Sequence, residues 1–314
     1  MAACSSQEKF NVTSYDAMAF AITTIQAFAG LWINGFIVCV LCVAQVNKKI
    51  FNSNEKILLV LGCCRFGESC FTWVYSFLTL ICAQCFYVHP MPQTFAAILS
   101  FFHSSNMWAS ASLCGFYCVK IANFQHTFFI YLKRKTDRMV PWLLFGSLLV
   151  SLSMALVGYY ITDRNFKISS STATKHLGIP SFTRDGLILL LFLISGFVSS
   201  TAFIAAIFSA LLLLSSLWRH KCRMQANSMR NLNVNAHIKA IKSILFFICI
   251  YSINFTGFLL LLFYFGKKEH LRMFFMSLFQ HALPVAHSLV LIFSNPNLEK
   301  TLLRTLTCFK LRQG

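Results

Sequence analysis

Charged residues are scarce in this chain, and acidic ones are the scarcest. Of the 314 residues, 11% are charged, and nine Asp and Glu stand against 27 Lys and Arg, which gives a formal net charge of +18. Soluble domains carry about a quarter charged residues, so this composition excludes an ordinary soluble protein. Hydrophobic residues make up 57% of the chain, and its mean hydropathy is +0.66. The sequence therefore predicts a membrane protein.

Motifs of the common catalytic and cofactor sites are missing as well. There is no GxxxxGK[ST] phosphate-binding loop, no HExxH zinc motif and no GxSxG nucleophile motif. The His and Cys residues lack metal-ligand spacing outside apolar segments, and Cys82 and Cys85 form one CxxC without a second pair. These absences predict that the chain is not an enzyme and holds no metal or cofactor.

Apolar segments long enough to span a membrane occur seven times. A transmembrane helix needs about 20 mainly apolar residues. The first segment is longer than the core of a signal peptide and follows no basic region, so we expect it to remain as the first helix. The sequence thus predicts an all-α membrane protein, a single-domain bundle of seven transmembrane helices. Their approximate limits are 17–46, 57–82, 94–124, 140–161, 186–217, 238–265 and 271–294.

The distribution of basic residues predicts the orientation of the bundle. The loops after the first, third and fifth helices, the start of the sixth helix and the tail from residue 295 hold 17 of the 27 Lys and Arg. The opposite side holds eight. The positive-inside rule then places the N-terminus outside and the C-terminus in the cytoplasm. The basic helix ends would attract anionic membrane lipid. Because they are divided among short loops, we expect no nucleic-acid partner.

Polar residues inside apolar segments are costly and often functional, so they are the first candidates for a site. Asn34 lies midway along the first segment, where a hydrogen bond between helices is the structural interpretation. Arg65 and Glu68 are three residues apart on one face of the second helix. An internal ion pair is the structural interpretation of these two charges, and a proton or ion relay is the functional alternative.

The third segment carries Trp108 and Ser112 four residues apart on one helix face, about halfway through the membrane. Lys120 follows Trp108 by 12 residues, or about 18 Å along a helix. That distance places Lys120 near the cytoplasmic boundary and argues against a role as the partner of an outside ligand. Two interpretations remain for this lysine, an anchor at the membrane surface and a part of a cytoplasmic switch.

The last two segments also carry polar residues. Asn254 lies in the outer half of the sixth segment. Ser277, Gln280 and His281 form a polar patch near the outer end of the seventh, and His287 lies deeper. Together with Trp108 and Ser112, the outer residues of this set are candidates for a ligand pocket lined by aromatic and hydrogen-bonding groups.

Five short motifs, spread in order over nearly the whole chain, resemble those of one receptor family. They are LLVLGCCR ending at Arg65, FYCVKIANFQH from Phe116, LWRHKCRMQ from Leu217, HIKAIK from His237 and PVAHSLVLIFSNPNL from Pro284. The patterns are similar to those of the bitter taste receptors (taste receptor type 2), a family of G protein-coupled receptors. The resemblance implies a plasma-membrane receptor with a wide pocket in its outer half, which binds small, mostly apolar bitter compounds and activates a gustducin-like or Gi-like heterotrimeric G protein.

The resemblance also assigns individual positions. By correspondence with family pocket positions, it implies ligand-binding roles for Tyr75, Trp108, Ser112, Asn254 and Ser277. For coupling to the G protein or switching, we expect roles for residues near the cytoplasmic helix ends and for a deeper histidine. These residues are Lys120, Arg134, His220, His237 and His287.

One departure from the family concerns glycosylation. Members usually carry a sequon in the second outer loop, and residues 162–185 contain none. The sequon Asn11-Val12-Thr13 precedes the first helix, so Asn11 is the expected acceptor.

Acidic residues are absent from the outer halves of the predicted helices between Asp16 and Asp185. We therefore expect no fixed counterion for amines, and recognition by stacking on Trp108, hydrogen bonds and shape. Two alternatives stay open, a vomeronasal type 1-like pheromone receptor and a channel or small-solute transporter. The odd number of helices and the lack of an internal repeat argue against a transporter.

Overall fold

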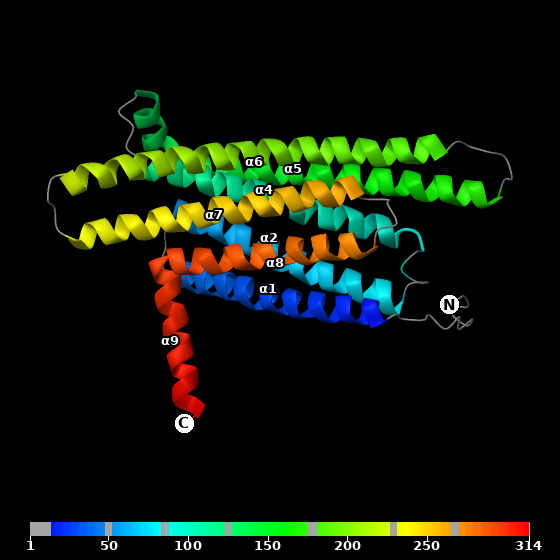
Figure 1. Cartoon of the computed structure of the whole chain (residues 1–314), viewed down its shortest axis with the longest axis horizontal. Helices are drawn as coiled ribbons and strands as arrows, with labels where there is room; N and C mark the ends of the chain where they lie inside the picture. The colour runs from blue at the N-terminus through cyan, green and yellow to red at the C-terminus, as the bar shows by residue number, and fades with distance from the viewer. Residues whose placement is uncertain are drawn as a thin grey trace.

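The computed structural model describes residues 14–47, 52–82, 86, 88–122, 127–174, 181–226, 231–264 and 270–313. In these ranges the regular secondary structure is helical and includes no strand, which confirms the predicted all-α fold. Figure 1 shows long helices lying side by side along one axis, with a last helix leaving one end of the bundle at a steep angle. We call that end the tail end and the opposite one, where the first helix begins, the N-terminal end.

The helices in these ranges are α1 (Ser14–Asn47), α2 (Ser53–Ile81), α4 (Met91–Ile121), α5 (Thr127–Thr174), α6 (Ser181–Ala226), α7 (Asn231–Tyr264), α8 (His270–Ser294) and α9 (Pro296–Gln313). The seven helices that correspond to the predicted spans all begin before the predicted starts, and α1, α5 and α6 also continue past the predicted ends. The largest difference is in α5, whose 48 residues reach about 72 Å, against about 30 Å of hydrocarbon. Residues 127–139, expected as part of a loop, are helical because no Gly or Pro interrupts them before Pro141.

Within the described residues, five helices are long and apolar enough to cross a membrane, in α1, α2, α5, α6 and α7. In α8 the apolar part that the structure describes is the shorter run His281–Ser294. Helix α4 is not among the five, and it carries the polar run from His103 to Asn106 at its middle. Its place in the bundle accounts for this composition, because α4 packs against α2, α5 and α6 and so turns much of its surface to protein.

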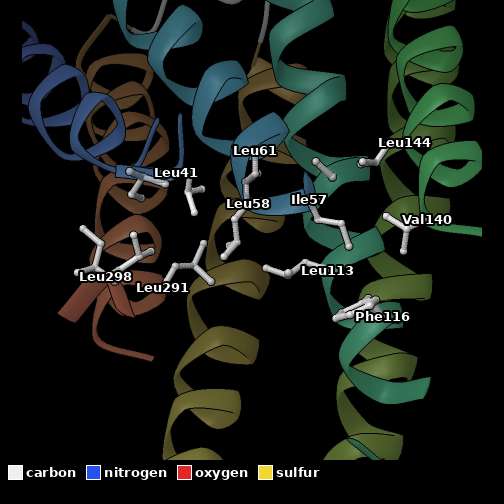
Figure 2. Packing of buried hydrophobic residues seen from close by; sticks show 13 residues of the cluster. Leu41, Ile57, Leu58, Leu61, Leu113, Phe116, Val140, Leu144, Leu291 and Leu298 are labelled. Carbon is white, nitrogen blue, oxygen red and sulfur yellow. The ribbon is translucent and has the colours of Figure 1, made fainter. Parts of the chain in front are cut away.

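The remaining contacts close the bundle into a ring around α4. Helix α1 packs against α2 and α8, and α7 packs between α6 and α8. The largest apolar cluster lies toward the tail end, where Leu58, Leu113 and Leu291 come from α2, α4 and α8 (Figure 2). Leu298 of α9 is 1% exposed in the same cluster. Burial of this leucine therefore fixes the first turn of α9 against the bundle.

Glycines allow α2 to approach its neighbours closely. A Cβ atom on Gly67 would overlap the ring of Phe102 of α4, and one on Gly30 of α1 would overlap Ser69 of α2. Small residues at such contacts let membrane helices pack backbone to backbone. The result is that the polar residues of α2 face α1, α4 and α8 at short range.

Candidate functional site

The polar residues of the bundle centre surround a small cavity between α2, α4, α7 and α8, which we call the central cavity. Its volume is about 20 Å³, room for one water-sized group. Its polar lining consists of Arg65, Glu68, His103, Asn106, Ser110, Tyr251, Asn254 and His287.

Arg65 is the hub of a buried hydrogen-bond network, at 4% exposure. Its Nη1 donates to Ser288 Oγ at 2.8 Å, and its Nη2 donates to Ser110 Oγ at 3.4 Å. Nη2 also lies 2.5 Å from Nδ1 of His287. A guanidinium can only donate, so this Nδ1 accepts, and the imidazole is neutral with its proton on Nε2.

The network continues into α1 through Ser288. The hydroxyl of Ser288 donates to Oδ1 of Asn34 at 2.8 Å, and Nδ2 of Asn34 donates to the carbonyl of Gly30 at 2.9 Å. One chain of hydrogen bonds therefore joins α1, α8, α2 and α4. Asn34 takes part in the bond between helices that its position in the sequence predicts.

Glu68 departs from the predicted ion pair. Its carboxylate accepts a hydrogen bond from Nδ2 of Asn106 in α4. The guanidinium of Arg65 instead directs its hydrogen bonds to α4 and α8. The two charges share a helix face but bind different residues. Both reach α4, Glu68 at Asn106 and Arg65 at Ser110, and Arg65 also reaches α8.

A second small cavity, also of about 20 Å³, adjoins the first between α1, α2 and α8. Glu68 and Pro284 line both cavities, and His281 and Gln26 line only the second. The structure thus brings Asn254 and His281, two of the predicted ligand residues, to either side of Glu68.

The other predicted ligand residues are placed differently. Trp108 packs with Phe203 and Tyr251 in an apolar cluster between α4, α6 and α7, and its Nε1 is buried without a hydrogen-bond partner. Ser112 is half-buried and lines neither of these two cavities. Tyr75 is 38% exposed and packs on Phe86 with ring centroids 5.3 Å apart. Ser277 and Gln280 belong to α8, but their side chains lie outside the described set, as does Asn11 altogether.

Aromatic rings connect this region to the lower half of the bundle. Phe203 of α6 stacks on Phe255 of α7 with centroids 4.1 Å apart, and Tyr251 stacks on Phe247 at 5.3 Å. The ring of His287 lies 4.8 Å from that of Phe247. The hydroxyl of Tyr251 donates to the backbone carbonyl of Met107 at 3.1 Å. These contacts form a continuous packed layer from α6 to α8.

Below that layer lies a much larger cavity, of about 510 Å³, which we call the tail-end cavity. It is formed by α2, α4, α6, α7 and α8, and Tyr117, Leu213, Ser243 and Asn295 are among its lining residues. His287 lines both this cavity and the central cavity. A thin layer that includes His287 and Phe247 therefore separates the two spaces.

The predicted coupling residues lie near the same end. Nζ of Lys120, in the last turn of α4, lies 2.7 Å from Oδ2 of Asp137 in α5. Arg134 and His220 are exposed on α5 and α6, and the side chain of His237 lies outside the described set. The structure thus adds a third interpretation for Lys120, an ion pair that ties α4 to α5.

Alanine substitutions separate the three interpretations of Lys120. Its side chain is 44% exposed and that of Asp137 is 59% exposed, so loss of the pair should cost less than about 1 kcal/mol of stability. If the ion pair matters for signalling, K120A and D137A lower signalling equally, and the double variant lowers signalling no further. The measurement is agonist-driven G protein activation at matched surface expression, with K133A as a control for membrane anchoring. Normal signalling by D137A beside a silent K120A would show that signalling does not depend on the ion pair with Asp137.

Several residues of the central cavity were not predicted from the sequence. His103, Asn106 and Ser110 all line it from α4. Their spacing of three and four residues places them on one helix face, and this periodicity was the available signal. Ser288 carried no such signal, since a serine in an apolar helix usually bonds to its own backbone.

Comparisons with known proteins agree with this architecture. The profile of a family described as "Taste receptor protein (TAS2R)" matches residues 12–310. The chain is 29% identical over 299 residues to a protein of Gallus gallus named "Taste receptor type 2 member 40", covering 92% of this chain and 94% of that one. It is 29% identical over 293 residues to "Taste receptor type 2 member 2" of Homo sapiens, covering 90% and 93%. It is 32% identical over 249 residues to "Taste receptor type 2 member 41" of Rattus norvegicus, covering 76% and 78%.

Proposed function

The chain belongs to the taste receptor family (TAS2R), and from that premise we propose that it detects small bitter compounds and activates a heterotrimeric G protein. The family is one of G protein-coupled receptors, seven-helix proteins of the plasma membrane rather than enzymes. The single observation that carries the proposal is the arrangement of two cavities along one bundle, separated by a packed layer that touches both.

We place the N-terminus outside and the tail end in the cytoplasm. The basic residues concentrate at the tail end, and α9 continues this trend with Lys300 and Arg304 exposed beside the exposed Leu303. An amphipathic basic helix that leaves the bundle at a steep angle to its axis (Figure 1) suits the anionic inner surface of the membrane. In this orientation Asn11 is outside, where glycosylation can reach it. The whole chain then forms one receptor domain.

The ligand enters from the N-terminal end. We assign its polar contacts to Asn254, His281, Ser277 and Gln280, and its apolar contacts to the aromatic region of α4, α6 and α7. Trp108 supports that region from within its apolar cluster, with Ser112 one turn below, and Tyr75 contributes from the outer part of α2. A pocket of this kind, mostly apolar with few polar groups, binds many compounds weakly.

The G protein, of the gustducin or Gi-like type, binds at the tail end. A cavity of about 510 Å³ with an apolar wall is suited to an apolar helical segment of a partner. Ligand contacts above the packed layer shift Tyr251, Phe247 and His287, and those shifts change the width of the tail-end cavity. Four residues at the rim of the tail-end cavity then contact the G protein or join neighbouring helices: Lys120, Arg134, His220 and His237.

A cell assay tests this function directly. Full-length receptor at the cell surface, coexpressed with a gustducin-type or Gi-type heterotrimer, is expected to give dose-dependent calcium or G protein dissociation signals with part of a broad panel of bitter compounds. Cells without the receptor are the control. Silence across the panel at verified surface expression would contradict the proposal.

A further inference from the structure

One face of α5 combines three cations with a long apolar surface. Arg134, Lys135 and Arg138 are exposed within little more than one helical turn. Aromatic and aliphatic side chains are exposed on the same face: Tyr131, Trp142, Phe145, Leu149, Leu152 and Leu156. These positions recur every three or four residues and therefore lie along one side of the helix. We call this set of nine residues the α5 stripe.

The α5 stripe points away from the protein. The opposite face of α5 is buried and packs against α4, with Val140, Leu144 and Ser151 at 1%, 7% and 0% exposure. Trp142 of the stripe is 74% exposed. The outward face of a membrane-spanning helix contacts lipid, and Trp is enriched where acyl chains meet headgroups. The apolar part of the stripe is therefore a surface for acyl chains.

The depth of the stripe follows from the ion pair between α4 and α5. Lys120 is in the last turn of α4, and its Nζ lies 2.7 Å from Oδ2 of Asp137. Arg138 follows Asp137 directly, so it is level with the end of α4, which we place at the cytoplasmic boundary. Trp142 lies about 6 Å further into the membrane, and Arg134 about 6 Å further out. The cations of the stripe are therefore at the level of the headgroups of the inner leaflet.

The positive charge of the stripe is not neutralised by the protein. Asp137 is the only acidic residue between 127 and 162, and its carboxylate is engaged by Lys120 on the side of α4. Among the described residues, the three stripe cations form no ion pair. The Nζ atom of Lys135 instead lies 2.5 Å from the hydroxyl of Tyr131 and 4.5 Å from the centre of its ring. Three cations within about 6 Å of helix length suit a headgroup with several phosphates, because a headgroup with a single net charge leaves most of them unmatched.

We propose that the α5 stripe binds a polyphosphoinositide of the inner leaflet. Its phosphates contact Arg134, Lys135 and Arg138, and Arg can hold a phosphate through two parallel hydrogen bonds. The hydroxyl of Tyr131 accepts from Lys135 and has its own proton to donate to the headgroup. An acyl chain lies along Trp142, Phe145 and Leu149. The site goes beyond the proposed function and relies only on the orientation given there, with the tail end in the cytoplasm.

Lipid titrations of the native chain test the site first. Purified full-length receptor in detergent is titrated with dioctanoyl phosphatidylinositol bisphosphate, dioctanoyl phosphatidylserine and soluble inositol trisphosphate. The bisphosphate lipid is expected to bind at least about tenfold more tightly than the serine lipid, because it brings more phosphate charge to the cations. It should also bind at least about tenfold more tightly than inositol trisphosphate, because only the lipid has acyl chains for the apolar surface.

A pair of matched variants then locates the binding. Arg134→Gln/Lys135→Gln/Arg138→Gln should weaken binding of the bisphosphate lipid at least about tenfold. The control Arg219→Gln/Lys300→Gln/Arg304→Gln removes the same charge from exposed positions of α6 and α9 and should stay within about threefold of the native affinity. Thermal unfolding verifies that both variants are folded, and the titrations of the native chain decide alone if the stripe variant is not.

Three results would overturn the site. Equal affinity for the two lipids would make the stripe a general charged surface, and equal affinity for the bisphosphate lipid and inositol trisphosphate would make it a site for free phosphates. A control variant that loses as much affinity as the stripe variant would place the binding elsewhere. The titrations need no agonist and no G protein, so a receptor that binds the lipid and activates no G protein would support the site and contradict the proposed function.

Discussion

Replacing Arg65 with Met is expected to lower the stability of the receptor by roughly 3 kcal/mol or more and to abolish agonist-driven signalling. The substitution keeps most of the apolar stem but removes the donors to Ser288 and Ser110. It also leaves Glu68 as a buried charge without a positive neighbour on its helix. Thermal unfolding of detergent-purified receptor measures the first effect, and G protein activation at matched surface expression measures the second.

Two variants make this result specific. Arg138 is exposed on α5, so Arg138→Met removes the same charge at little cost, within about 0.5 kcal/mol. The double variant Arg65→Met/Glu68→Gln removes both buried charges and should recover part of the lost stability. An Arg65→Met receptor with the native unfolding temperature and the native level of G protein activation would show that the network around Arg65 is dispensable.

Filling the tail-end cavity is expected to have the second large effect. Ser243 of α7 lines that cavity, and Trp at this position would occupy the space assigned to the G protein. Ser243→Trp should lower G protein activation at least about tenfold. Agonist affinity measured without G protein should stay within about threefold of the native value, since Ser243 lines neither of the two small cavities described above.

The serine has a structural contact that needs its own control. Ser243 Oγ lies 2.6 Å from Ser294 Oγ of α8, so Ser243→Ala tests loss of that bond while leaving the cavity open. Ser215→Trp places the same ring on an exposed position of α6. Both controls should signal normally. Normal signalling by Ser243→Trp would exclude the tail-end cavity as the site of coupling.

The sequence predicted the helices of the bundle well, for a physical reason. A helix needs about 20 apolar residues to cross the hydrocarbon, and such segments can be recognised in a single sequence. This requirement sets the length of the apolar segment and not the length of the helix, so the polar extensions of α5 were not predicted. The requirement does not apply to α9, which is amphipathic and shorter.

The site was harder to predict, because spacing along one helix does not tell which neighbour a residue meets. Glu68 was paired with Arg65 on spacing alone, whereas packing against α4 gives it Asn106. Trp108 shares a face with Ser112, yet it packs toward α6 and α7, away from the polar cavity. Lys120 and Asp137 are 17 residues apart, and only the packing of α5 against α4 brings them together.

We propose that an outside ligand controls a cavity at the cytoplasmic end of the same bundle. Agonist-dependent nucleotide exchange tests it most directly, measured on a purified Gi-type heterotrimer with full-length receptor in isolated membranes. We expect a bitter agonist to accelerate exchange several-fold with native receptor and not with Ser243→Trp. Solute flux through liposomes containing the receptor, with no agonist-dependent exchange, would contradict it.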